Sequence, residues 1–228
     1  DLDDVTGATT GVVTATVTGT NIFTLLTTSN KEKIGTGNAL NFSLTGSTVD
    51  GNASTSIAAS DLIELQALTS GSILVVVDGS ITGSIADLKT VYAANTAKSG
   101  GAAPAGSIFS GLEAEPIVVA TTETTTLAAD LNYLNGKNGD NTVTHSTTAL
   151  SGTKADIATA FAADTGDGAT LVGLGADVAI TVTDSSITCA NLEAVNLLST
   201  ATIISTATEI IGTADQLEDT LLRNVGKK

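Results

Sequence analysis

The residues of this chain that could do chemistry are few and lie far apart in the sequence. His145 is the only histidine and Cys189 the only cysteine. General acid–base or nucleophilic catalysis needs a second group held beside the first, and no spacing in the sequence supplies that partner. Glu113 and Glu115 could share a proton as a carboxylate pair, but the sequence does not set their distance or surroundings. We therefore predict that the chain is not an enzyme.

Calcium is the metal ion that the sequence suits best. Turns rich in oxygen and glycine occur at residues 50–52, 138–141 and 165–168, and calcium takes about six to eight oxygen ligands from such turns. Asp140 and Asp167 each lie beside a glycine, so we predict these two carboxylates as the metal ligands, with weak binding that the fold does not require. Asx-Gly turns also form without metal. The sequence lacks the helix–loop–helix calcium motif, the glycine-rich calcium nonapeptide, phosphate loops, dinucleotide fingerprints and zinc spacings.

The elements that must hold these residues repeat along the chain. A short segment that ends in Asp-Leu or a close variant recurs, and we call its last residue the anchor. The anchors are Leu62, Leu88, Leu131, Ile157, Leu192 and Leu217. They are separated by 26, 43, 26, 35 and 25 residues. A period of this size indicates stacked supersecondary units.

Each anchor lies at the start of a predicted helix. Ser or Thr stands four residues before several anchors and Asp, Asn or Gln directly before them, which is the pattern of a capped helix N-terminus. The cap residues are Ser84, Thr153, Thr188 and Thr213. Apolar residues after each anchor predict a helix of about two to three turns with one buried face. The predicted helices begin near residues 60, 85, 128, 154, 189 and 214.

Continuous runs of β-branched residues precede the helices. Strands that are buried on both faces have this composition, and parallel sheets bury both faces. We therefore predict parallel neighbours in one sheet, at strands near residues 73–77, 117–120, 142–145, 178–183 and 202–205. The predicted fold class is an α/β repeat, a right-handed solenoid of parallel strands and short helices with about six units of roughly 26 residues.

The repeat also divides the chain. Residues 46–228 form the predicted β/α solenoid, with loop insertions near 98–116 and 165–177 that account for the two long spacings. Residues 1–45 are less regular and form a predicted N-terminal cap or degenerate repeat. His145 falls on a predicted strand. Cys189 follows a helix cap, where it is either a small buried residue or a thiol whose pKa the helix N-terminus lowers.

Composition and charge argue against several classes of partner. The chain has 228 residues and a formal net charge of −15, from 24 acidic and 9 basic residues. This charge argues against binding to nucleic acid or to an anionic membrane surface. No apolar run approaches the roughly 18 residues that a membrane span needs. The acidic start lacks a signal peptide. The polar ends and the missing initiator methionine lead us to expect a segment of a longer protein.

Two stretches resemble a known kind of repeat. They are residues 180–188, Ile-Thr-Val-Thr-Asp-Ser-Ser-Ile-Thr, and residues 150–157, Leu-Ser-Gly-Thr-Lys-Ala-Asp-Ile. Both resemble the repeats of very large secreted surface proteins of bacteria, notably marine cyanobacteria, which are often described as RTX-like or hemolysin-type calcium-binding proteins. The resemblance covers roughly residues 46–228. It implies secretion to the cell surface, a long multidomain parent, and calcium elsewhere in that parent.

Three functions fit these observations. We predict a non-catalytic structural or adhesive repeat segment of a large exported cell-surface protein, with other domains of the same long chain and a surface polysaccharide or protein as partners. The alternative is a carbohydrate-active enzyme or glycan-binding module on a solenoid, which needs clustered carboxylates or basic residues and aromatic rings on one face. Aromatic residues make up only 3% of this chain. A scaffold for protein interactions is the third function.

Overall fold

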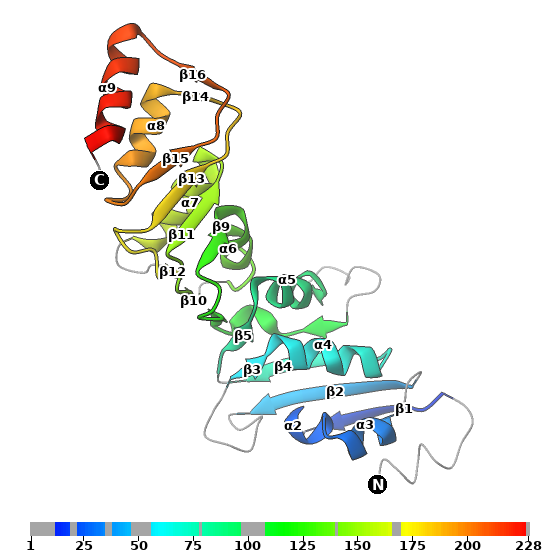
Figure 1. The fold of residues 1–228 in the computed structure, drawn as a ribbon. Helices are drawn as coiled ribbons and strands as arrows, with labels where there is room; N and C mark the ends of the chain where they lie inside the picture. The colour runs from blue at the N-terminus through cyan, green and yellow to red at the C-terminus, as the bar shows by residue number, and fades with distance from the viewer. Residues whose placement is uncertain are drawn as a thin grey trace. The chain divides into compact units, whose positions relative to one another are not determined.

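The computed structural model describes residues 12–18, 22–34, 38–46, 56–77, 79–96, 108–139, 141–165 and 170–226. These residues form an α/β protein in which short helices follow short strands along the chain (Figure 1). The chain divides into two compact units, one of residues 1–119 with 137–141 and one of residues 120–136 with 142–228.

The first unit contains two sets of parallel strands. The strands are β1 (Thr14–Thr18), β2 (Ala39–Gly46), β3 (Ile57–Ala58), β4 (Ile73–Val77), β5 (Ile81–Gly83), β6 (Asn95–Thr96), β7 (Phe109–Ser110) and β8 (Ile117–Val119). One sheet has the order β1-β2-β4-β7-β6, and a second set joins β3, β5 and β8, with every pair parallel.

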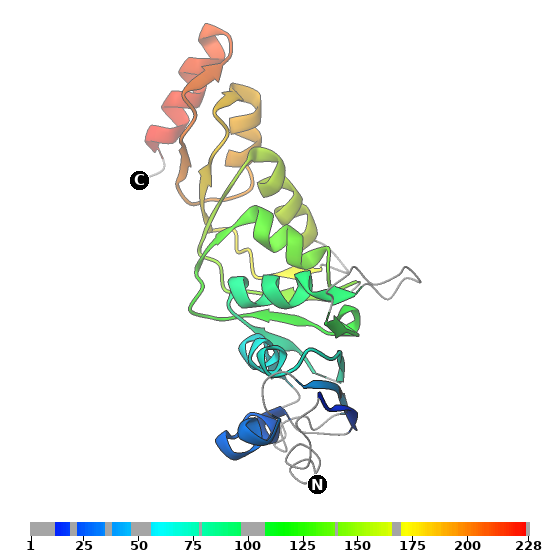
Figure 2. The same cartoon turned by 90° about the vertical axis from the view of Figure 1, so that its right-hand side faces the viewer.

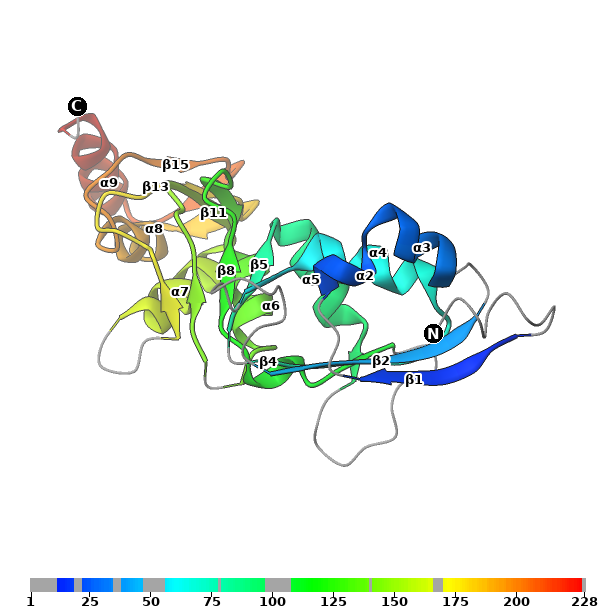
Figure 3. The ribbon, with the colours of Figure 1, turned by 90° about the horizontal axis from the view of Figure 1, so that it is seen from below.

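Short helices accompany these strands. They are α2 (Ile22–Leu25), α3 (Thr28–Ile34), α4 (Ala59–Leu68), α5 (Ile85–Ala93) and the 3-10 turn η1 (Leu112–Ala114). Helix α4 lies beside α5 (Figure 2). Helices α2, α3 and α4 lie on the same side of β1, β2 and β4 (Figure 3).

The second unit repeats the same elements. Its strands are β9 (Thr125–Leu127), β10 (Val143–Thr144), β11 (Ala149–Gly152), β12 (Leu171–Val172), β13 (Ala179–Val182), β14 (Ser186–Thr188), β15 (Ile203–Ser205) and β16 (Glu209–Ile211). Its helices are α6 (Ala128–Asn135), α7 (Lys154–Asp164), α8 (Cys189–Asn196) and α9 (Ala214–Gly226). The parallel sets are β9-β11-β13-β15, β10-β12 and β14-β16. Helix α6 lies beside α7, and α8 lies beside α9 (Figure 2).

The predicted helix starts are confirmed to within one residue, at Ala59, Ile85, Ala128, Lys154, Cys189 and Ala214. All four predicted caps also form. The backbone N–H of the third helical residue donates to the cap hydroxyl at 3.1 Å for Ser84, 3.2 Å for Thr153, 3.2 Å for Thr188 and 3.3 Å for Thr213. These bonds satisfy backbone donors that a helix leaves open at its start.

The predicted parallel pairing is confirmed, but the prediction that the main strands share one sheet is wrong. Strand β4 pairs with β2 and β7, β8 pairs with β5, and β13 pairs with β11 and β15. The physical reason is a second strand of two to four residues that ends within two residues of the start of each helix from α4 to α9. These strands are β3, β5, β9, β11, β14 and β16. Because the chain turns before this strand, each repeat contributes to more than one sheet.

The anchors form the core of the repeats. Leu62, Leu88, Leu131 and Ile157 are fully buried and Leu192 is nearly so, whereas Leu217 in the last repeat is only half-buried. Full burial of a leucine side chain contributes about 1.5–3 kcal/mol, so each buried anchor stabilises its repeat by an amount of this order.

The described part of residues 1–45 is regular. Strands β1 and β2 pair in parallel from Thr14 opposite Ala39 to Thr18 opposite Ser43, and α2 and α3 lie between them in sequence. The described parts of 98–116 and 165–177 contain β7, η1 and β12. The assignment of residues 1–45 as a cap and of these two segments as insertions stays a prediction.

Candidate functional site

The two residues predicted as calcium ligands, Asp140 and Asp167, lie outside the described residues. Within the described ranges, no three or more His, Cys, Asp or Glu side chains are grouped so that they could hold a metal ion. A metal site built from histidine, cysteine and carboxylates alone is therefore not found in this part of the chain.

The acidic residues at the helix starts mainly serve the helices. Asp87 accepts from the Ser84 hydroxyl at 2.8 Å and Asp156 accepts from the Thr153 hydroxyl at 2.7 Å. These carboxylates also oppose the positive end of the helix dipole. At the start of α4, burial and the neighbouring charge of Glu64 raise the pKa of Asp61, while Lys31 lowers it.

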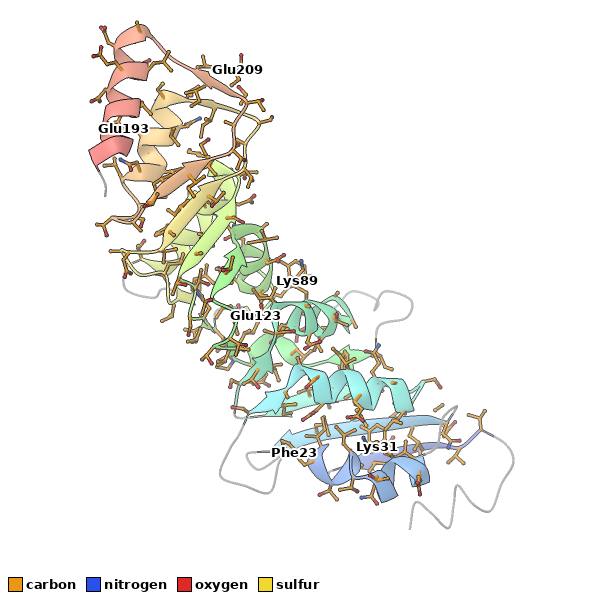
Figure 4. All side chains as sticks on the ribbon, viewed as in Figure 1. Phe23, Lys31, Lys89, Glu123, Glu193 and Glu209 are labelled. Atoms are coloured by element: carbon orange, nitrogen blue, oxygen red, sulfur yellow. The ribbon has the colours of Figure 1, made fainter. Side chains whose placement is uncertain are left out.

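Lys31 itself pairs with Glu64 across α3 and α4; Figure 4 labels this lysine. Both side chains are substantially exposed, so the pair contributes little to the free energy of unfolding.

His145 directly follows β10, so its predicted place on a strand is off by one residue. It is buried, and its Nδ1 accepts from the Thr147 backbone N–H at 3.4 Å. The neutral ring therefore carries its proton on Nε2, and this buried nitrogen has no hydrogen-bond partner among the described residues. Burial lowers the pKa of His145, and the charge of Asp164 raises it in part.

Cys189 is a small buried residue, as one of the two sequence interpretations held. A Cβ built on Gly212 would lie 2.6 Å from the Cys189 sulfur, so the backbone at Gly212 packs directly on the thiol. The cysteine thus fills a contact between the start of α8 and the end of β16.

Glu113 of η1 and Glu115 directly after it belong to the first unit. Asn95, the first residue of β6, donates its side-chain N–H to Glu113 Oε1 at 3.0 Å. Glu115 is only 3% exposed, and Tyr92 of α5 is 1% exposed. Burial raises the pKa of Tyr92, and the negative charges of Glu115 and Glu113 raise it further. The buried Tyr92 hydroxyl has no hydrogen-bond partner among the described residues.

A polar residue stands seven positions after each of the first five anchors, and we call this the post-helix polar position. Its members are Thr69, Asn95, Asn138, Asp164 and Ser199. Three of them accept a backbone N–H: Thr69 from Gly71 at 2.9 Å, Asp164 from Gly173 at 2.9 Å and Ser199 from Ala201 at 3.1 Å. At Asn95 and Asn138 the side-chain oxygen is buried and has no partner among the described residues.

Asn138 belongs to the same unit as Glu113 and packs close to it in space. A Cβ built on the next residue, Gly139, would lie 2.9 Å from the backbone oxygen of Glu113. The Asn138 side chain donates to the Asn141 carbonyl at 2.7 Å, which fixes the amide.

A hollow lies in the second unit. It has a volume of about 340 Å³ and is lined by Ala176 and residues 196–200. Ser199 donates to the Val178 carbonyl at 2.6 Å, so its hydroxyl holds the turn together. No acidic or basic side chain lines this hollow, and it offers no group for acid–base chemistry.

Sequence reasoning named Glu113 and Glu115 as a carboxylate pair and 138–141 as an oxygen-rich turn, but it did not single out Asn95, which bonds Glu113. The missed signal is the post-helix polar position, which recurs with the repeat and is polar each time. Comparison with protein-family models, with curated proteins and with solved structures gives no match to this chain. None of the described helices combines the length and apolar character that crossing a membrane requires.

Proposed function

We propose that this chain is a non-catalytic structural or adhesive repeat segment of a large exported cell-surface protein. Its architecture in this proposal is a right-handed solenoid of about six strand–helix units. The observation that carries the proposal is that the polar residues which recur with the repeat bond the backbone of their own helices and turns. The hydroxyls at Ser84, Thr153 and Thr188 cap helices, and Thr69 and Ser199 hold the turns that follow them.

The last repeat supports a role in assembly. Ile204 of β15 is 55% exposed and Ile211 of β16 is 51% exposed. The anchor Leu217 is half-buried. Strand β15 pairs with β13, and β16 with β14, and neither has a partner on its other edge among the described residues. Unpaired edges beside exposed apolar side chains are surfaces on which another strand can pack. The partners in this proposal are other domains of the same long chain and a surface polysaccharide or protein.

The experiment that tests the proposal combines turnover and adhesion. The purified chain is incubated with a panel of polysaccharides and esters, and its binding to immobilised glycans and to bacterial surface preparations is measured in parallel. We expect no turnover, together with retention on at least one surface that the Ile204→Lys, Ile211→Lys double variant weakens. Turnover of any substrate by the purified chain would contradict the proposal. A double variant that keeps both the retention and the self-association of the parent chain would also contradict it.

A further inference from the structure

Two core positions of the last repeat are open. Ile210 on β16 and the anchor Leu217 on α9 are half-buried. The equivalent residues on β5 and β11, which also stand seven residues before an anchor, are Ile81 and Leu150, and they are 0% and 1% exposed. The anchors that follow these two strands are fully buried. The interior of the last repeat is therefore uncovered on one side.

The earlier repeats of the second unit show what covers such positions. Strand β13 pairs with β11 on one edge and β15 on the other, and α7 lies beside both α6 and α8. Strands β15 and β16 have no partner on their outer edges among the described residues, and α9 is the last described helix (Figure 1). The contact between repeats thus joins a strand edge and apolar side chains to the same features of a neighbour, and the last repeat presents both.

The opposite edge of the same sheet is different. Strand β9 forms that edge, and Leu127 on it is 52% exposed, close to the 55% of Ile204 on β15. The core residues around β9 are nevertheless buried, namely Thr126, Ala128 and Leu131. An unpaired edge with an exposed apolar side chain does not by itself open the core. Among the described repeats of the second unit, the last one combines all three features.

The N-terminal edge of the first unit is polar. Strand β1 has no partner on its outer edge among the described residues, and its exposed side chains are Thr14, Thr16 and Thr18. Helices α2 and α3, which follow this strand, bury Ile22 and Ile34 completely. This edge is a poor complement for the isoleucines of the last repeat, so the head of one chain does not suit the tail of another.

We propose that the last repeat is a dimerisation surface, on which the last repeat of a second copy packs about a two-fold axis. The inference rests on the assembly role in the proposed function. An apolar edge complements itself, and two-fold dimers are the commonest symmetric assemblies of soluble proteins. Strand β15 then runs antiparallel to β15 of the second copy, which pairs both open edges. Ile210 and Leu217 gain the cover that their equivalents already have.

Like charges meet in this arrangement. Asp215 and Glu218 on α9 are exposed, and each copy carries a formal net charge of −15. Repulsion between the copies opposes the apolar contact, and salt screens this repulsion. Self-association should therefore strengthen as salt is added, whereas binding of a basic partner to the same acidic helix would weaken.

Sedimentation equilibrium of the purified chain tests the proposal directly. The average mass is measured over a range of protein concentrations, in NaCl from about 0.05 to about 0.5 M. We expect the mass to rise from that of one chain to that of two and to stop there, because a two-fold interface closes on itself. The dissociation constant should fall as the salt concentration rises.

Three single variants locate the interface. Ile204→Lys should weaken dimerisation at least about tenfold, because it places an unpaired charge in the contact. Leu127→Lys is the matched control, since this side chain is equally exposed on the other edge of the same sheet. Phe23→Lys changes a 47% exposed residue of α2, labelled in Figure 4, and tests the N-terminal end. Both controls should dimerise as the parent does, and circular dichroism should be unchanged in all three variants.

Several results would overturn the proposal. A parent chain that stays monomeric up to about 1 mM has no such interface. A mass that grows beyond two chains, or weakening by Phe23→Lys, indicates head-to-tail contact instead. Equal weakening by Ile204→Lys and Leu127→Lys removes the last repeat from the contact. Retention on a glycan surface by a chain that stays monomeric overturns the dimer alone, whereas turnover of a substrate by a dimeric chain overturns the proposed function alone.

Discussion

The caps can be tested within a single helix, because α7 carries two threonines in different roles. Thr153 precedes the helix, accepts from the Asp156 backbone N–H at 3.2 Å and donates to the Asp156 carboxylate at 2.7 Å. Thr159 lies on the exposed side of the same helix, and its hydroxyl only donates back to the Ala155 carbonyl at 2.9 Å. Thr153→Ala and Thr159→Ala therefore make the same chemical change with opposite expected consequences.

Thr153→Ala removes the cap and should lower the free energy of unfolding by about 1 kcal/mol. Thr159→Ala replaces a residue of lower helix propensity in the helix interior. It should raise the free energy of unfolding by between zero and about 0.7 kcal/mol. With a urea slope of about 1–3 kcal/mol/M, the Thr153→Ala midpoint should fall by about 0.3–1 M. The Thr159→Ala midpoint should stay or rise.

The assay is urea unfolding followed by circular dichroism, with amide hydrogen exchange in α7 as a local readout. Exchange is needed because a chain with two compact units need not unfold in one transition. Asp156→Ala should cost much less in the Thr153→Ala background than in the parent, since the two side chains bond each other. Equal destabilisation by Thr153→Ala and Thr159→Ala would refute the role of the cap.

Further predictions concern the core, a strained turn and a titrating group. Leu131→Ala should cost about 2–5 kcal/mol in urea unfolding, more than the loss of any cap, because the side chain is fully buried. Gly173→Ala should destabilise by at least about 1–3 kcal/mol, because the residue has φ +140° and a Cβ would lie 2.1 Å from the His145 carbonyl oxygen. The lowered pKa of His145 means that the unfolded chain binds this proton more readily, so stability should be full above about pH 6.5 and fall as the pH drops through the folded pKa. His145→Gln should lack this pH dependence in thermal melts. Asp140→Ala with Asp167→Ala should leave the circular dichroism spectrum unchanged.

The helices could be predicted from the sequence because their start signals are local. A hydroxyl four residues before an anchor and a carboxylate or amide directly before it are enough to place α5, α7, α8 and α9. Helices α4 and α6 lack a capping side chain, yet they were located as well, because the anchor and its apolar neighbours keep the same spacing.

The second strand of each repeat could not be predicted in the same way. Strands such as β5 and β14 have three residues each, which is too short for an alternating pattern to appear. Their pairing is decided by the neighbouring repeat, so the sequence of one repeat does not contain the information. For the same reason the hydrogen bond between Asn95 and Glu113 was missed, since these residues meet only when separate parts of the first unit pack together.

Glycine shows that the repeats come in pairs. Gly83, Gly152 and Gly212 each stand five residues before an anchor. A Cβ on these glycines would approach the first residue of the preceding helix, to 3.0 Å for Ala59, 3.1 Å for Ala128 and 2.6 Å for Cys189. The corresponding residues of the other three repeats are Ile57, Thr126 and Ile187, which carry buried side chains where the second repeat of each pair has glycine.

The pairs also explain the uneven spacing of the anchors. The short spacings of 26, 26 and 25 residues fall within a pair, and the spacings of 43 and 35 residues fall between pairs. Two strands, β4 with β5, β10 with β11 or β15 with β16, join the helices of one pair, whereas at least three strands separate α5 from α6 and α7 from α8. The additional strands are β6, β7 and β12. Strands β9 and β14, which precede the first helix of their pairs, each pair with the strand before the next helix, β11 and β16. The strand before the first helix of each pair thus starts a new set of parallel strands, and the strand before the second helix extends that set. A glycine in this second strand lets its backbone approach the first helix closely. The structural repeat is therefore the pair of helices with their strands. The first helix of the pair begins with a small residue, and the strand before the second helix carries the glycine that packs against this residue.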